Sequence, residues 1–174
     1  EVWADALAMF WLLLAVYPVC AVDFKYKLIP DSMSVGGIVA GLLLSLIPGG
    51  ISPLQSFVGA VAAGGGLWLL GFVAGKVLKK EAMGFGDVKL LAGYGALMGW
   101  QSAAMILVVA AIAGIVVMIP YAKIQAKVAE KASVDDSKDA PGQIPFGPFL
   151  AIAAPVIYLW GDSLLEAYLQ FILG

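Results

Sequence analysis

Long apolar runs separated by short polar connections dominate the chain. A helix needs roughly 20 mostly apolar residues to cross a bilayer, and six runs are candidates for such helices: 4–22, 33–48, 54–78, 87–100, 102–122 and 146–161. The pattern predicts an all-α membrane protein built as a bundle of six transmembrane helices. Glycines are frequent in the third and fourth runs, which predicts close helix packing there.

The fourth run is short and follows the segment Gly84-Phe85-Gly86. This predicts a helix that begins below the membrane surface, after non-helical backbone. Such backbone is tolerated at membrane depth where it lines a cavity or is buried in protein. The segment therefore marks a candidate site.

The C-terminal stretch from Asp162 to Gly174 has apolar residues at helical spacing, interrupted by Asp162 and Glu166. A helix with one apolar and one polar face lies in the membrane interface, so one interpretation is a C-terminal interfacial helix. A simple continuation of the sixth helix explains the same pattern equally well.

Composition supports the membrane assignment. Of the 174 residues, 62% are hydrophobic and 13% charged, whereas soluble domains have about 45–50% apolar and about 25% charged residues. Nothing marks a second domain, so 1–174 is predicted to be a single membrane-embedded domain. The absence of His and the single Cys20 exclude Cys/His zinc sites, an internal disulfide and His-based nucleophile systems within this sequence.

The lysines, which are the only basic residues, predict the orientation. Nine of the ten fall in alternate connections, at 23–32, 76–86 and 123–145, and the tenth, Lys89, lies just inside the fourth helix on the same side. By the positive-inside rule, these connections face the cytoplasm and both termini lie outside. The loop at about 123–145 is the longest polar stretch. It is interpreted as a solvated connector, with a lid or docking surface as the alternative.

Two aspartates lie at the same predicted edge of the membrane. Asp23 ends the first helix and Asp87 begins the fourth. Ionisable groups at membrane depth are costly and usually functional. Two carboxylates within hydrogen-bond reach share a proton, so that one activates a water as general base while the other polarises a carbonyl. The pair predicts aspartic peptidase chemistry, which needs no metal ion and no His.

Each aspartate also has a simpler interpretation. Asp23 alone would pair with Lys25 or Lys27 in the headgroup region. Asp87 alone would be a helix N-cap, a position that Asp favours. The occurrence of both at one membrane edge, with glycines beside Asp87, favours the catalytic interpretation.

Four further residues are candidates for supporting roles. Gly84 and Gly86 leave the backbone bare, so that an extended peptide can approach. Asp31 follows Pro30 and precedes a helix, which favours a helix N-cap over a contribution to substrate binding. Lys89 is interpreted as a snorkelling or Asp-pairing residue, with a contact to the substrate as the alternative.

Three pieces of the sequence resemble the type IV prepilin peptidases, the GxGD-type membrane aspartyl peptidases. They are DFKYKLIPD at 23–31, MGFGDVKLLAGYGALMGW at 83–100 and IPFGPFLAIAA at 144–154. The resemblance implies a six-helix bundle with a cytoplasm-facing site in the bacterial inner membrane, and Asp23 and Asp87 as the catalytic pair. It also implies that the substrates are prepilins or type II secretion pseudopilins, whose leaders are cut just after a glycine that precedes an apolar helix.

One departure from the family pattern concerns cofactors. Many bacterial members carry an N-terminal segment with paired CxxC zinc motifs, which is associated with N-methylation by S-adenosylmethionine. This sequence has only Cys20 and starts at Glu1, which is expected either of a peptidase-only member or of a fragment that contains the peptidase part. The IPFGPFLAIAA piece resembles the bifunctional bacterial members more, which favours a fragment. The peptidase is expected to need no cofactor, with zinc and S-adenosylmethionine belonging to the other segment. The expected partners are the prepilin substrate and membrane lipid, without nucleic acid.

Two other classes of function compete with the peptidase. A small proton-coupled transporter or channel predicts carboxylates near the membrane midplane and repeated, broken helices. A structural subunit of a pilus or secretion assembly predicts aspartates that only cap helices. Both key aspartates instead lie at one edge, and no convincing repeat is found, which favours the peptidase.

Overall fold

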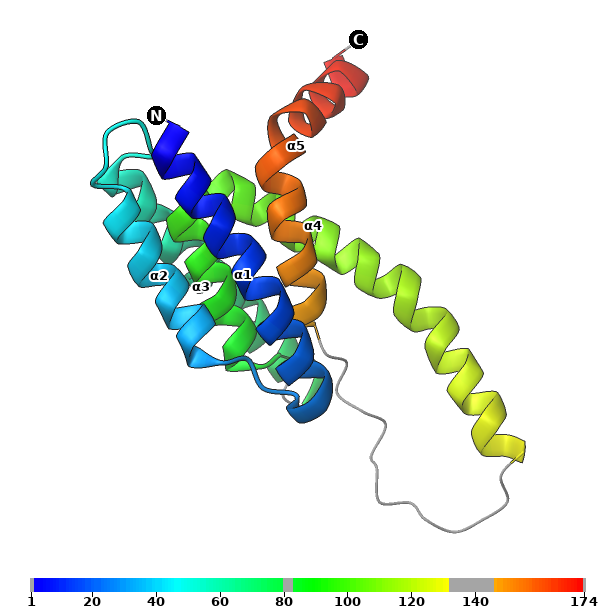
Figure 1. The fold of residues 1–174 in the computed structure, drawn as a ribbon. Helices are drawn as coiled ribbons and strands as arrows, with labels where there is room; N and C mark the ends of the chain where they lie inside the picture. The colour runs from blue at the N-terminus through cyan, green and yellow to red at the C-terminus, as the bar shows by residue number, and fades with distance from the viewer. Residues whose placement is uncertain (1, 80–82, 132–145, 174) are drawn as a thin grey trace.

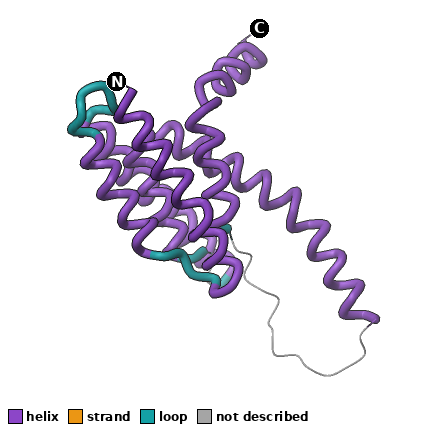
Figure 2. The backbone as a smooth tube through the Cα atoms, in the orientation of Figure 1, coloured by secondary structure: helices purple, strands orange, loops and turns teal. Residues whose placement is uncertain are grey.

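The computed structural model describes residues 2–79, 83–131 and 146–173, and the regular structure within them is helical (Figure 1, Figure 2). The helices are α1 (Val2–Tyr26), α2 (Asp31–Leu44), α3 (Pro53–Leu78), α4 (Phe85–Lys131) and α5 (Gly147–Leu173). Three stretches are long and apolar enough to cross a membrane, namely Trp3–Tyr26, Pro53–Val77 and Phe85–Val117, while Asp31–Leu44 and Gly147–Gly161 are shorter apolar helices. The all-α prediction is confirmed.

The six predicted runs correspond to five helices, because α4 joins the fourth and fifth predicted runs across a kink. Its one non-helical residue is Gly99, with φ 83° and ψ 168°. Glycine adopts this positive φ without steric cost, so the chain changes direction there without a loop. The predicted boundary between 100 and 102 therefore corresponds to a break inside one helix. Phe85 and Gly86 are already helical, so the predicted non-helical segment ends at Gly84.

The C-terminal tail continues α5, which runs to Leu173 and contains Pro155. The helix bounds therefore agree with the continuation, and a position of the tail in the membrane interface stays a prediction. Figure 1 shows that α5 bends near its C-terminal part. Helix α4 likewise extends to Lys131 and takes up the first part of the predicted loop at 123–145. The acidic residues of that loop, Asp135, Asp136 and Asp139, lie outside the described residues.

Glycines allow α3 and α2 to pack closely on α4. A Cβ atom added to Gly59 would overlap the backbone of Gly95, and one added to Gly41 would lie 2.6 Å from the carbonyl carbon of Ala96. Small residues let helix backbones approach in this way. The Ser56 hydroxyl donates a hydrogen bond to the Ala96 carbonyl at 2.7 Å. The predicted close packing of the glycine-rich helices is confirmed.

Alanine at Gly59 should destabilise the bundle by about 1–3 kcal/mol or more, because backbone atoms of α4 block the added methyl group. Gly66 on the same helix is the matched control, since a Cβ atom there meets nothing within 4 Å. Gly66→Ala should leave stability unchanged or raise it through helix propensity. Thermal unfolding in one detergent checks both. Equal melting temperatures for the two variants would contradict this packing.

The α1–α2 connection and the start of α4 lie at one end of the bundle. Figure 1 shows the N-terminus of α1 beside the α2–α3 connection, with the α1–α2 connection at the opposite end. At that opposite end Ile29 of the α1–α2 connection packs against Gly86 at the start of α4. The start of α4 thus lies beside the end of α1, as the lysine pattern predicts.

Candidate active site

Asp23 lies near the C-terminal end of α1 and is buried, with 5% of its surface exposed. Its Oδ2 atom has no hydrogen-bond partner among the described residues. Within the same residues, the ion pair at this end joins Asp31 to Lys89 and does not involve Asp23. Lys25 and Lys27 are both exposed. The simpler interpretation of Asp23, a headgroup pair with a neighbouring lysine, is therefore not supported.

Asp87 lies in the first turn of α4 and is also buried, with 9% of its surface exposed. Because α4 begins at Phe85, the N-cap position belongs to Gly84, and Asp87 is the third helical residue. The N-cap interpretation of Asp87 is thus corrected. Its amide donates a hydrogen bond to the Gly84 carbonyl at 3.2 Å. A Cβ atom on Gly84 would lie 3.5 Å from Asp87 Oδ2, so the carboxylate folds back over Gly84.

The two carboxylates come from the end of α1 and the start of α4, which meet at one end of the bundle. Ile29 links the two positions. A Cβ atom on Gly147, which faces Asp23 Oδ2, would lie 3.1 Å from Ile29 Cδ1, and one on Gly86, the neighbour of Asp87, would lie 3.1 Å from Ile29 Cβ. The structure therefore brings together the two aspartates that the sequence singled out.

Gly147, the first residue of α5, forms a third side of the site. A Cβ atom there would lie 2.7 Å from Asp23 Oδ2 and 3.1 Å from Ile29 Cδ1. Only glycine leaves the Asp23 carboxylate in place, because real Cβ atoms do not approach an oxygen that closely. The IPFGPFLAIAA piece was noticed in the sequence, but nothing in it indicated this contact.

Ile29 covers the site from the α1–α2 connection. A Cβ atom on Gly86 would lie 3.1 Å from Ile29 Cβ, so the Ile29 side chain occupies the room that Gly86 was predicted to leave for a peptide. The sequence analysis missed Ile29, because an isoleucine next to Pro30 carries no chemical signal.

Tyr94 is a second buried residue that the sequence analysis missed. It follows Asp87 by two helical turns on α4, which places it on the same face, and only 2% of its surface is exposed. Its hydroxyl has no hydrogen-bond partner among the described residues. The interior behind the aspartate pair therefore contains a further polar atom.

Asp31 and Lys89 form an ion pair between α2 and α4, with Lys89 Nζ 2.8 Å from Asp31 Oδ1. Asp31 is the first residue of α2, and the N-cap position is Pro30, which has no side-chain cap. The predicted N-cap role of Asp31 is therefore corrected, while the Asp-pairing interpretation of Lys89 is confirmed. The Lys89 ammonium also lies 5.4 Å from the centroid of the Phe85 ring.

Glutamine at Lys89 should change stability by less than about 1 kcal/mol, because exposed ion pairs contribute about 0.2–1 kcal/mol. The Asp31 side chain is 71% exposed, so water replaces the lost partner. Thermal unfolding of Lys89→Gln, Asp31→Asn and the double variant measures the coupling between the two residues. A coupling well above that range would show that the pair is a major link between α2 and α4.

Metal ligands were not expected at this site. In the three described segments, no group of three Cys, Asp or Glu side chains is arranged as metal ligands would be. The cofactor-free peptidase stays a prediction.

Comparisons with known proteins agree with this geometry. The sequence pattern of the type IV leader peptidase family matches residues 6–119. The chain belongs to this family. The match spans both Asp23 and Asp87, the residues that meet at the end of the bundle.

Several curated relatives share nearly the whole chain and have the name "Prepilin leader peptidase/N-methyltransferase". The protein from Aeromonas salmonicida strain A449 is 36% identical over 169 residues, which are 97% of this chain and 53% of the relative. The Aeromonas hydrophila protein is 34% identical over 94% of this chain and 52% of its own length. The Legionella pneumophila protein is 31% identical over 95% and 53%. This leader peptidase family chain thus spans about half the length of these relatives. No solved structure matches it.

Proposed function

We propose that this chain is a membrane aspartic endopeptidase that removes the leader from type IV prepilins or type II secretion pseudopilins. The cut falls after a glycine, at the cytoplasmic face of the bacterial inner membrane. The observation that carries the proposal is that two buried carboxylates, Asp23 and Asp87, lie at the same end of the bundle, next to glycines that both contact Ile29. Family membership supports the same assignment.

The pair supplies both the base and the acid of peptide hydrolysis. The ionised carboxylate takes a proton from a water molecule as the water oxygen attacks the scissile carbonyl carbon. The protonated carboxyl donates a hydrogen bond to the carbonyl oxygen, on which negative charge develops. The tetrahedral intermediate then collapses, the C–N bond breaks, and the proton is delivered to the leaving amine.

The substrate reaches the pair as an extended strand. Ile29 packs against Gly86 and Gly147 beside Asp23, so it moves aside when a peptide binds. Gly84 and Gly86 then leave the backbone of α4 bare on the substrate side. Asp31 and Lys89 act as a link between α2 and α4 rather than as substrate ligands, because each already binds the other.

The location of the pair fits a substrate that crosses the membrane edge. A prepilin has a basic leader on the water side and an apolar helix in the lipid. Asp23 and Asp87 each lie at the end of an apolar span. They meet the bond between leader and helix without drawing the helix out of the bilayer.

Cleavage of a model prepilin by the purified chain tests the proposal. Mass spectrometry should find a single cut after the leader glycine, and an excess of metal chelator should leave the rate unchanged. A substrate in which a bulky residue replaces that glycine is the matched control and should not be cut. A chain that unfolds cooperatively on heating, yet cuts no prepilin or cuts at another bond, would contradict the proposal.

A further inference from the structure

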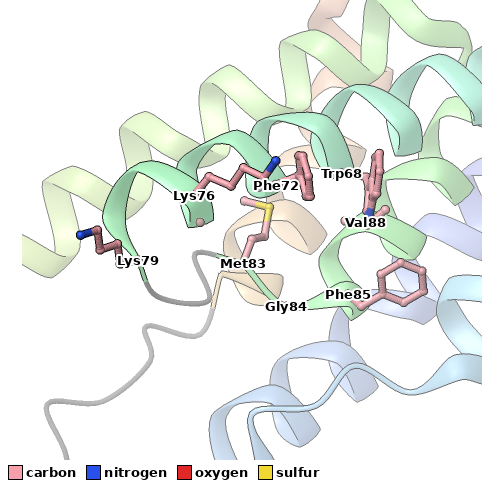
Figure 3. A pocket seen from close by; sticks show the side chains of 10 residues that line it. Trp68, Phe72, Lys76, Lys79, Met83, Gly84, Phe85 and Val88 are labelled. Atoms are coloured by element: carbon pink, nitrogen blue, oxygen red, sulfur yellow. The ribbon is translucent and has the colours of Figure 1, made fainter.

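A groove lies between the C-terminal half of α3 and the start of α4, and Met83 and Gly84 line it just before α4 begins (Figure 3). Its volume is about 690 Å³. Ten described residues line it. They include two lysines and the apolar side chains of Met83, Phe85 and Val88, and none of the ten is a carboxylate. The groove is not part of the space between the two aspartates.

The α3 wall of the groove is aromatic and cationic. The rings of Trp68 and Phe72 stack with centroids 5.5 Å apart. The Lys76 ammonium lies 4.4 Å from the centroid of the Phe72 ring. Lys79 follows at the end of the helix, and Figure 3 shows the four side chains in this order along α3. Figure 3 shows the Lys76 side chain lying back toward Phe72 and the Lys79 side chain pointing away from both. The aromatic wall thus carries one ammonium group over Phe72, with a second lysine at the end of the helix.

The opposite wall and the base are apolar. Phe85 and Val88 line the groove from α4, and Gly71 and Gly75 line it from α3. A Cβ atom on Gly71 would lie 3.3 Å from Met83 Cβ. The absence of a side chain at Gly71 therefore lets Met83 approach α3 closely.

The position of the groove relative to the membrane defines its occupant. The apolar span of α3 ends at Val77, so Trp68 and Phe72 lie within the span while Lys79 lies just beyond it. The neighbouring Leu69, Leu70 and Val73 are exposed and continue the apolar surface into the lipid. Basic pockets at the cytoplasmic edge of membrane helices bind anionic lipid headgroups.

We propose that this groove is a binding site for an anionic phospholipid of the surrounding bilayer. Lys76 holds the headgroup phosphate beside Phe72, Lys79 adds positive charge at the end of α3, and the acyl chains lie on Trp68 and Phe72. The basic leader of the proposed substrate is repelled by the same two lysines, so it does not occupy the groove. This inference does not depend on the peptidase activity.

Lipid binding can be measured on the intact protein by native mass spectrometry during titration with phosphatidylglycerol or phosphatidylcholine. Lys76→Gln/Lys79→Gln should lower the preference for the anionic lipid about tenfold, given the attraction that each lysine near the surface contributes. The matched control is Lys25→Gln/Lys27→Gln. Lys25 also lies over an aromatic ring, that of Tyr26, and Lys27 and Lys79 share a φ of 53°.

A second variant, Gly75→Leu, fills the groove and keeps both charges, and it should also reduce binding. Retained melting temperatures for all three variants confine the effect to the groove. Equal losses in the groove and control double variants, or no loss in the groove variants, would overturn the proposal. Displacement of the lipid by millimolar inorganic phosphate would indicate a free-anion site instead. Unchanged lipid binding with an altered KM for prepilin would assign the groove to the substrate.

Discussion

Replacing Asp87 with asparagine should abolish the proposed leader cleavage and leave the folded protein at least as stable as wild type. An amide cannot accept the proton of the attacking water, and loss of a general base costs about 100- to 10,000-fold in rate. Stability is retained because Asn has nearly the same shape and because one of two buried carboxylates is removed. Asp23→Asn should behave in the same way, since its Oδ2 atom makes no hydrogen bond within the described residues.

Initial cleavage rates and thermal unfolding in the same detergent measure the two effects separately. Asp31→Asn is the matched control, because Asp31 is a carboxylate at the same end of the bundle but is exposed and pairs with Lys89. It should keep most of the activity. Substantial cleavage by Asp23→Asn or Asp87→Asn would rule out the two-aspartate mechanism, and a collapse of both melting temperatures would indicate structural roles.

Alanine at Gly147 should lower kcat about 100-fold with a much smaller effect on KM. The added Cβ atom would lie 2.7 Å from Asp23 Oδ2 and 3.1 Å from Ile29 Cδ1, so the carboxylate must move away from its partner. Displacement of a reacting group by about 1 Å can cost about 100-fold in rate. KM is expected to change little, because the substrate-binding backbone of α4 is not altered.

Gly114→Ala is the control for Gly147→Ala. Gly114 is also buried, but a Cβ atom there would lie 3.9 Å from the rings of Phe146 and Phe149, at ordinary contact distance. Its kcat should remain close to wild type. If Gly147→Ala loses activity only in proportion to its loss of folded protein, or raises KM alone, then Gly147 does not position Asp23.

The chain belongs to the type IV leader peptidase family and spans about half the length of the relatives that it matches. The relatives are named for two activities, and this chain aligns with about half the length of each relative. The described site contains the paired carboxylates that hydrolysis requires. A variant series on this chain tests the proposed peptidase activity.

Much of the fold follows from the order of the residues. Runs of apolar residues are long enough to require helices in a bilayer, because an unpaired backbone group is too costly there. The spacing of Lys25, Lys76 and Lys89 placed three chain segments at one end. The two aspartates stood out because charge is rare in such a sequence, so a local pattern sufficed to nominate them.

Tertiary packing decided the rest. The break at Gly99 and the continuity of α5 depend on backbone torsions and neighbouring helices, which hydropathy does not record. The same holds for Asp31, whose partner Lys89 is 58 residues away, and for Asp87, which is the third residue of α4 and not its N-cap. The contact of Gly147 with Asp23 arises only when α5 meets α1. Hydrophobic patterns specify which residues leave water, whereas close contacts between distant segments specify where each carboxylate lies.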